Sequence, residues 1–188
     1  MAEFPKMKVS KLDAARRQLD CAIRLWINDD DPVSIHTLAF AAFEIINDLN
    51  AKRGNKAVTL QGLTETLAKP GHLTEVMGYM KKPMTFFKHS NRDPLAILEF
   101  APEVNEYVFL FAANGLKELG EQLTDLQHTF VQWMLVHHPN LIKKGQTAFP
   151  EFGDKEVQAV ATMRAVTKRQ FFDTFLSGIA AKRTAKLP

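Results

Sequence analysis

The sequence contains one cysteine, Cys21, among 188 residues. A single thiol excludes a disulfide framework within the chain and a metal site built only from cysteines. Because Cys21 falls inside a helical pattern of apolar residues, we expect its side chain to be buried and unreactive. A lone cysteine is also typical of proteins that work in a reducing compartment.

Long apolar runs are missing as well. The apolar clusters are interrupted by Glu, Asn or Lys well before they reach the roughly 20 residues that a membrane-spanning helix needs. Residues 1–6 lack the apolar centre of a secretory signal. These two absences predict a cytoplasmic protein that has no membrane partner.

Several enzyme motifs are also absent. The chain has no Gly-rich phosphate loop, no nucleophile elbow, no Cys-x-x-Cys pair and no His-Glu-x-x-His motif. We therefore expect no cofactor and no bound metal ion. No segment alternates convincingly between apolar and polar residues, and the only short run with β character, residues 57–60, is too brief to build a sheet.

Helical periodicity fills most of the chain instead. Apolar residues recur at steps of three and four over residues 10–27, 35–49, 124–138 and 157–179. Residues 103–119 are apolar on nearly all sides, which predicts the most buried helix. The pattern predicts an all-α fold, one antiparallel helical bundle of about six or seven helices that spans residues 1–188 as a single domain. We expect residues 180–188 to be a frayed tail.

Capping residues indicate where these helices begin and end. Asp31-Pro32 opens the second helix, and Gly54 ends it. Thr124 with Gln127 forms a capping box for residues 125–138, and Asp154 caps one last long helix. A helix that starts near residue 74 contains Pro83, which should kink it or restart it.

The charges are unevenly distributed along a chain whose formal net charge is only +3. Over residues 155–188, seven Lys and Arg residues, including Lys168, Arg169 and Lys182, stand against two acids. Over residues 89–128 the balance reverses, with seven acids against two basic residues. A basic end of this kind could steer a polyanion such as RNA. Alternatively, the basic helix docks beside the acidic segment or faces water.

Residues 86–94, Phe-Phe-Lys-His-Ser-Asn-Arg-Asp-Pro, carry the densest group of reactive side chains. His89 could give or take a proton, or donate to a phosphate. Lys88, Asn91 and Arg92 could hold a phosphate, and Arg92 could do so with two parallel hydrogen bonds. We therefore predict two catalytic residues, His89 and Arg92, and a set of nucleic-acid contacts made by Lys88, Asn91, Lys168, Arg169 and Lys182.

The same segment also has a purely structural interpretation. Lys88 and His89 could cap the carbonyls of one helix while Asp93 caps the next, because Asp-Pro junctions are often turns. Arg92 would then pair with Asp93 or Glu99. Asp93 would then open a short helix over residues 95–100, in the way that Asp31 opens the second helix.

A metal site is a further alternative. If His36 met His89 beside Asp93 or Glu44, two imidazoles and a carboxylate could bind a metal ion. His36 lies beside the apolar stripe of its helix, however, where a hydrogen-bonded core histidine is the more frequent arrangement. His137 and His138 end a helix and point in different directions, so they are not expected to share a metal ion.

Three features of the first half of the chain resemble the HEPN superfamily of helical domains. They are an Ala-containing first helix, an antiparallel second helix and the motif Phe86-Phe87-Lys88-His89. Many members of that superfamily are toxin ribonucleases or RNA binders in defence and toxin–antitoxin systems. The catalytic signature of the superfamily, Arg followed after four to six residues by His, is absent here: Lys82 has this spacing to His89, and Arg92 follows His89. The resemblance implies a protein that binds or cleaves RNA, and a member without the signature binds RNA or a partner without cutting.

Three hypotheses about function therefore stay open. The first is RNA binding or cleavage, which predicts that the basic cluster Lys168, Arg169 and Lys182 lies on the same side as His89. The second is a non-catalytic interaction protein, such as a homodimer formed through an exposed apolar patch at Phe171, Phe172 and Phe175. The third is a metal-dependent helical enzyme that uses His36 and His89.

Overall fold

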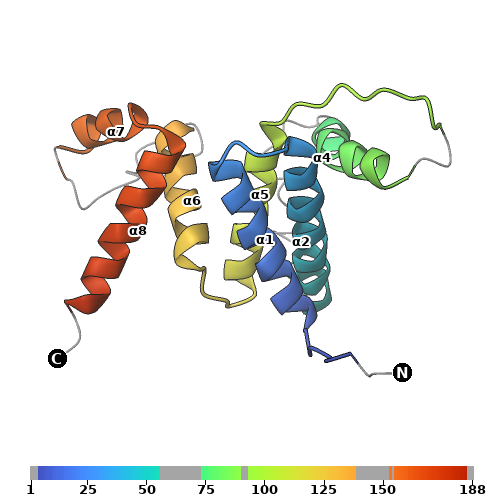
Figure 1. The fold of residues 1–188 in the computed structure, drawn as a ribbon, viewed down its shortest axis with the longest axis horizontal. Helices are drawn as coiled ribbons and strands as arrows, with labels where there is room; N and C mark the ends of the chain where they lie inside the picture. The colour runs from blue at the N-terminus through green and yellow to red at the C-terminus, as the bar shows by residue number, and fades with distance from the viewer. Residues whose placement is uncertain (1–3, 56–72, 90–92, 139–152, 154, 186–188) are drawn as a thin grey trace.

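The computed structural model describes residues 4–55, 73–89, 93–138, 153 and 155–185, with the side chains of residues 73–77 excepted. Within these residues the fold is all-α, as the periodicity predicts, with seven helices and no strand. The helices, labelled as in Figure 1, are α1 (Lys11–Ile27), α2 (Pro32–Arg53), α4 (Leu73–Lys88), α5 (Val104–Glu118), α6 (Asp125–His137), α7 (Glu156–Arg164) and α8 (Lys168–Thr184). The features predicted at residues 56–71, 140–152 and Asp154 lie outside the described residues.

Short-range signals fix the ends of the first two helices. The Ser10 hydroxyl accepts from the backbone N–H of Asp13 at 3.0 Å, and Asp13 reaches back to Ser10, which completes a capping box for α1. Asp31 caps α2 by accepting from a first-turn N–H at 2.8 Å. Gly54 ends α2 in the left-handed region at φ 80°. The predicted boundaries of both helices are therefore confirmed.

The core lies where α1, α2, α5 and α6 meet. α1 packs along α2, α2 packs along α5, and α6 contacts α1, α5, α7 and α8. Nine of the 15 residues of α5 are buried. Eight of the 13 residues of α6 are buried as well. The central position of α5 is confirmed, but the prediction that α5 alone is the most buried helix is wrong, because α6 is enclosed to the same degree.

An aromatic cluster holds α8 against this core. Trp26, near the end of α1, makes edge contacts with rings from α5, α6 and α8 at centroid distances of 5.5 to 6.2 Å. Its partners are Phe109, Phe130, Trp133 and Phe172. Each such pair contributes about 0.5–1.5 kcal/mol beyond the burial of apolar area. The basic C-terminal helix is thus fixed on the side of the bundle that α1 and α6 form.

The last helix is divided into two, in contrast to the prediction. α7 ends at Arg164, and α8 begins at Lys168 behind a capping box in which Thr167 accepts from the N–H of Gln170. The Thr-x-x-Gln signal that starts a new helix was therefore present in the sequence. α8 continues to Thr184 and so includes residues 180–184 of the tail that is predicted to fray.

Residues 95–100 do not form the predicted short helix. The N–H of Ala96 donates to the carbonyl of Asp93 at 3.2 Å in a turn, and no helix follows before α5. Pro102 disfavours helical geometry in the residue before it, and the few residues between Pro94 and Pro102 are too short for a stable helix. By contrast, α4 continues through Pro83 without restarting.

Cys21 is exposed, so the prediction of a buried thiol is wrong. The buried face of α1 is formed by Ala15, Leu19, Ala22, Ile23 and Trp26. Cys21 follows Leu19 by two residues, which is about 200° of rotation around a helix. Its side chain therefore lies on the opposite side from the core, and periodicity alone contained this information.

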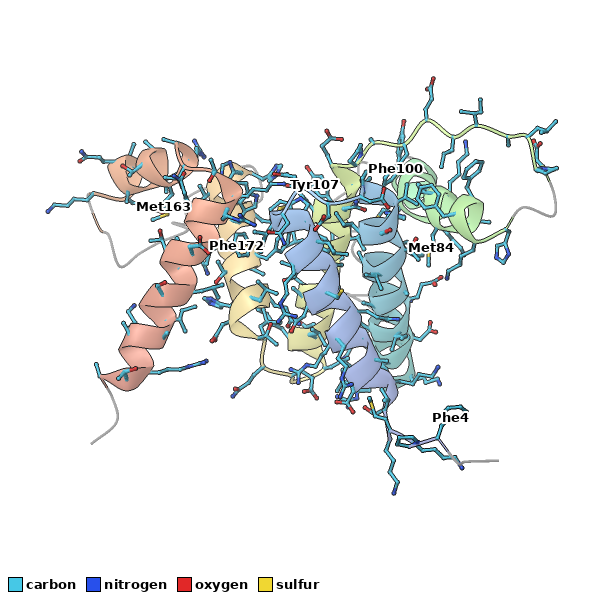
Figure 2. All side chains as sticks on the ribbon, in the orientation of Figure 1. Phe4, Met84, Phe100, Tyr107, Met163 and Phe172 are labelled. Atoms are coloured by element: carbon cyan, nitrogen blue, oxygen red, sulfur yellow. The ribbon has the colours of Figure 1, made fainter. Side chains whose placement is uncertain are left out.

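The helices are spread along one axis of the molecule. Figure 1 shows α7 and α8 at one end, the core helices in the middle, and α4 with residues 93–100 at the other end. Figure 2 shows the same separation between Phe100 and Phe172. Among the described helices, none combines the length and the apolar character that crossing a membrane requires.

Candidate functional site

The predicted site at residues 86–94 lies at the end of α4. Phe86 and Lys88 belong to the last turn of this helix, and His89 follows it directly. Two predicted site residues, Asn91 and Arg92, fall outside the described residues, so their roles stay predictions.

Lys88 and His89 are both exposed to solvent. Neither side chain has a hydrogen bond or an ion pair in the described part of the chain. They do not cap helix carbonyls there, and Asp93 opens a turn rather than a helix. The structural interpretation of this segment is therefore wrong for the caps by Lys88 and His89 and for the helix start at Asp93. The ion pair of Arg92 with Asp93 or Glu99 stays a prediction, because Arg92 lies outside the described residues.

The outer face of α4 carries an alternating row of aromatic and basic side chains. Tyr79, Lys82 and Phe86 follow one another at steps of three and four, so they share one face of the helix. Tyr79 is 61% exposed and Phe86 is 37% exposed. Lys82 is exposed, and His89 continues the spacing just beyond the helix end. We call these four residues the outer face of α4.

The opposite side of α4 explains why this face is turned to solvent. Met80 and Met84 are 2% and 3% exposed and pack into the core. The ring of Phe87 packs against Phe100 at a centroid distance of 5.3 Å. The spacing of Met80 and Met84 in the sequence predicts a helix with an apolar stripe. The sequence does not predict that Tyr79 and Phe86 are exposed, because aromatic side chains most often fill cores.

A pocket adjoins the outer face of α4. Its volume is about 300 Å³. Its walls come from α4, from the segment that leads to Pro102, and from the first residue of α5. The lining residues are Gly78, Tyr79, Lys82, Pro83, Leu98, Glu99, Phe100, Ala101 and Val104. The sequence did not indicate this pocket, because residues 98–101 were expected to end a helix.

His36 lies beneath this region and is fully buried. Its Nδ1 is 2.7 Å from Oδ1 of Asn105, and its Nε2 is 3.1 Å from the carbonyl oxygen of Met80. Burial lowers the pKa of His36, and the two hydrogen bonds oppose that shift in part. The prediction of a hydrogen-bonded core histidine is confirmed.

These contacts leave His36 no ring nitrogen for a metal ion. No group of three or more His, Cys, Asp or Glu side chains within the described segments could hold one. The rings of Phe40, Phe87 and Phe100 surround the imidazole at centroid distances of 5.2 to 5.9 Å. His36 therefore acts as a packing and hydrogen-bonding residue that connects α2, α4 and α5.

The predicted basic residues of α8 do not meet His89. Lys168 Nζ donates to the carbonyl of Trp26 at 2.9 Å, forms an ion pair with Asp29, and lies 4.6 Å from the centroid of the Trp26 ring. Arg169 donates to Asn28 at 2.5 Å. Both side chains therefore contact the C-terminal end of α1, while Lys182 is exposed further along α8. Figure 1 shows α8 and α4 at opposite ends of the molecule.

The apolar patch expected for a dimer through α8 is largely internal. Phe171 and Phe172 are each 1% exposed, and Phe175 is half-buried and stacks on Phe171 at a centroid distance of 4.3 Å. The most exposed large apolar side chains of the described chain are instead Ile97 and Leu95, at 95% and 90%. The two highest exposures of large apolar side chains in the described chain therefore lie near α4 and not on α8.

No protein-family model, no curated protein and no solved structure matches this chain. The resemblance to the HEPN superfamily accordingly stays a prediction, and what is known of the site comes from the geometry of α4 and its surroundings.

Proposed function

We propose that the protein binds single-stranded RNA along the outer face of α4. The observation that carries this proposal is the exposed row Tyr79, Lys82, Phe86 and His89, in which aromatic and basic side chains alternate on one side of a helix. Proteins that bind single strands combine basic side chains along the backbone with aromatic rings on which bases stack. The α4 end offers both elements within one helix.

The row holds its two aromatic rings apart along α4, so that each ring can stack on a different base of one strand. Tyr79 and Phe86 are seven residues apart, which is about 10 Å along a helix axis. Lys82 lies between them and has no ion pair in the described part of the chain, so its ammonium group is available to a phosphate. Lys81 and Lys88 are also exposed on α4 and add positive charge beside the row.

The proposal is limited to binding and includes no cleavage step. His89 has no acid or base partner within hydrogen-bond distance among the described residues, and Arg92 lies outside them. A general acid or base acts on a substrate atom that lies within about 3 Å of it, and the proposal assigns no such atom to His89. His89 therefore enters the proposal as a donor to phosphate.

Fluorescence anisotropy with a labelled single-stranded RNA at low salt tests this function. We expect Tyr79→Ala and Phe86→Ala each to weaken binding by about tenfold, because stacking of one base contributes roughly 1–3 kcal/mol. Phe4→Ala is the matched control, because Phe4 is 87% exposed but lies far from α4, as Figure 2 shows. A gel of the RNA after incubation separates binding from cleavage.

Two outcomes would overturn the proposal. One is that the wild-type protein fails to bind any single-stranded RNA at low salt, where phosphate contacts are strongest. The other is that Tyr79→Ala and Phe86→Ala bind as tightly as wild type, which would locate RNA binding elsewhere on the molecule.

A second candidate function, formation of a homodimer, is favoured by the exposure of Leu95 and Ile97. Both side chains lie in a non-helical segment whose exposed apolar residues could pack on a second copy. Sedimentation velocity of wild type and of a Leu95→Ser/Ile97→Ser double variant tests this candidate, because the wild type should form a dimer and the double variant should be a monomer. Val157→Ser is the control, because Val157 is 83% exposed on α7. A wild type that stays monomeric at high concentration removes this candidate.

A further inference from the structure

The pocket beside α4 has the size of a site for one small group. Its volume of about 300 Å³ lies at the lower end of ligand pockets, which span roughly 300–1,000 Å³. A whole oligonucleotide or a helix of a partner would not enter it. One base of an RNA strand that runs along the outer face of α4 could enter, because Tyr79 and Lys82 belong to both the face and the pocket.

The walls of the pocket are suited to a flat ring. Pro83 and Val104 give it apolar surface from α4 and α5, and the half-buried residue Phe100 also lines it. Tyr79 adds a second aromatic ring at the solvent side. Unstacked bases in single-stranded RNA are commonly held between aromatic and apolar side chains of this kind.

Two side chains of opposite charge complete the lining. Lys82 and Glu99 both border the pocket and both are exposed. Neither has an ion pair or a hydrogen bond within the part of the chain that the structure describes. An ionised carboxylate can only accept hydrogen bonds, so Glu99 selects ligands that present N–H donors. Lys82 selects an anion, such as the phosphate of a nucleotide.

The four RNA bases differ in the donors that they offer to such a carboxylate. Guanine presents two adjacent donors, N1–H and the N2 amino group, which match the two oxygens of one carboxylate. Adenine and cytosine each place an amino group beside a ring nitrogen that only accepts, and uracil places its one N–H between two carbonyl oxygens. Guanine is therefore the base that Glu99 fits best.

We propose that this pocket takes a guanine base of single-stranded RNA, with Glu99 accepting from N1–H and N2–H and with Lys82 on the adjoining phosphate. The inference rests on the proposed RNA binding at the outer face of α4 and adds base selectivity to it. It predicts that the protein distinguishes RNA strands by a single guanine at one position.

The test compares single-stranded U-rich octamers that differ only in one central base, which is guanine, adenine, cytosine, uracil or hypoxanthine. We expect the guanine oligomer to bind the wild type about tenfold more tightly than the adenine, cytosine and uracil oligomers, in line with a good bidentate contact. Hypoxanthine lacks the N2 amino group and should fall between. Glu99→Gln should abolish the preference, whereas Glu103→Gln, an exposed acid outside the pocket, should retain it.

The outcomes separate the two proposals. Equal binding of all oligomers by the wild type, or a guanine preference that survives in Glu99→Gln, overturns the inference and leaves RNA binding standing. If no oligomer binds, the proposal of RNA binding is rejected. Calorimetry with guanosine 5′-monophosphate then tests separately whether the pocket binds a guanine base. Binding of this nucleotide to wild type and its loss in Glu99→Gln would support the pocket, and no binding to wild type would overturn it. Because Glu99 is exposed, its variant is expected to fold.

Discussion

His36 Nδ1 lies 2.7 Å from Oδ1 of Asn105 and joins α2 to α5 in the interior. The amide group of Asn105 is oriented by its donation to the carbonyl of Pro32 at 3.3 Å, so its oxygen faces the imidazole. The other ring nitrogen of His36 faces the carbonyl of Met80 at 3.1 Å. Both ring nitrogens thus face acceptors, although a neutral imidazole has only one N–H. This histidine is the point at which α2, α4 and α5 are connected.

We expect His36→Ala to lower the free energy of unfolding by about 3 kcal/mol, because it creates a cavity and leaves buried acceptors without a donor. Guanidinium unfolding near pH 7.5, followed by circular dichroism, measures the change. His128→Ala is the control, since His128 is exposed on α6. A loss below about 0.5 kcal/mol would contradict the connecting role.

The stability should fall as the pH is lowered through about 6.5, where an unperturbed histidine takes up its proton. Burial lowers the pKa of His36 in the folded state, so the unfolded chain binds more protons in this range. The pKa of His137 is lowered in the same direction, by burial first and by Arg164 next. The loss should level off below the folded-state pKa values of the two histidines.

Urea unfolding midpoints between pH 7.5 and pH 5 measure this dependence. The range stays above the region where Asp13 and Asp31 matter. Their pKa values are lowered by hydrogen bonds from Ser10 and Ser34, so their contribution is lost only as the pH falls below about 3.8. A His36→Gln variant should show a shallower pH dependence, and an unchanged slope would assign the effect to other groups.

Gly115→Ala should destabilise the protein, because α2 and α5 approach closely at this residue. A Cβ at position 115 would lie 2.6 Å from Cγ2 of Ile46, and Asn50 Nδ2 donates to the carbonyl of Gly115 at 2.9 Å. We expect a loss of about 2 kcal/mol from overpacking. Gly178→Ala, where nothing lies within 4 Å of the new Cβ, should instead stabilise α8 by about 0.5–1 kcal/mol. Thermal unfolding measures both changes, and a Gly115→Ala variant as stable as wild type would contradict the close approach.

Lys168→Ala should weaken the attachment of α8 to α1. The variant loses the hydrogen bond to the carbonyl of Trp26, the ion pair with Asp29 and the contact with the Trp26 ring. We expect a loss of about 1 kcal/mol, which denaturant unfolding can measure. Lys182→Ala, on the exposed part of the same helix, should have no measurable effect. Equal stability of wild type and Lys168→Ala would show that Lys168 does not contribute to the attachment of α8.

Lys82→Gln should reduce the salt dependence of RNA binding. Each phosphate contact on a single strand contributes about 0.7 to the slope of log affinity against log salt. We expect the slope to decrease by about this amount in the variant, as measured by anisotropy at several salt concentrations. Lys52→Gln, an exposed lysine at the end of α2, serves as the control and should retain the wild-type slope.

Local signals account for the parts of the fold that were predicted correctly. Ser10, Asp31 and Gly54 set helix ends through hydrogen bonds and backbone geometry within a few residues of the chain, so no tertiary information is needed. The errors also have local causes. The capping box at Thr167 divides the helix predicted over residues 157–179, and Asp93 begins a turn where a helix start is predicted.

The candidate site was only partly predictable. Nothing in the sequence distinguishes Lys168 from Lys82, since both are lysines on predicted helices. In the structure Lys168 contacts the end of α1, whereas Lys82 faces solvent without an ion pair in the described residues. Whether a lysine forms an ion pair depends on which helix packs beside it, and that packing is a contact between segments distant in the sequence. The pocket depends in the same way on residues 98–101 approaching α4.

The sequence by itself determined that this chain is helical, where its first two helices begin and end, and that His36 is a core residue, because periodicity and capping act over a few residues. Only the tertiary structure decided that Tyr79, Lys82, Phe86 and His89 face solvent beside a pocket, and that the cations of α8 lie at the far end of the molecule. Exposure and charge pairing are set by how helices distant in sequence pack, and that packing depends on the whole core rather than on any one segment.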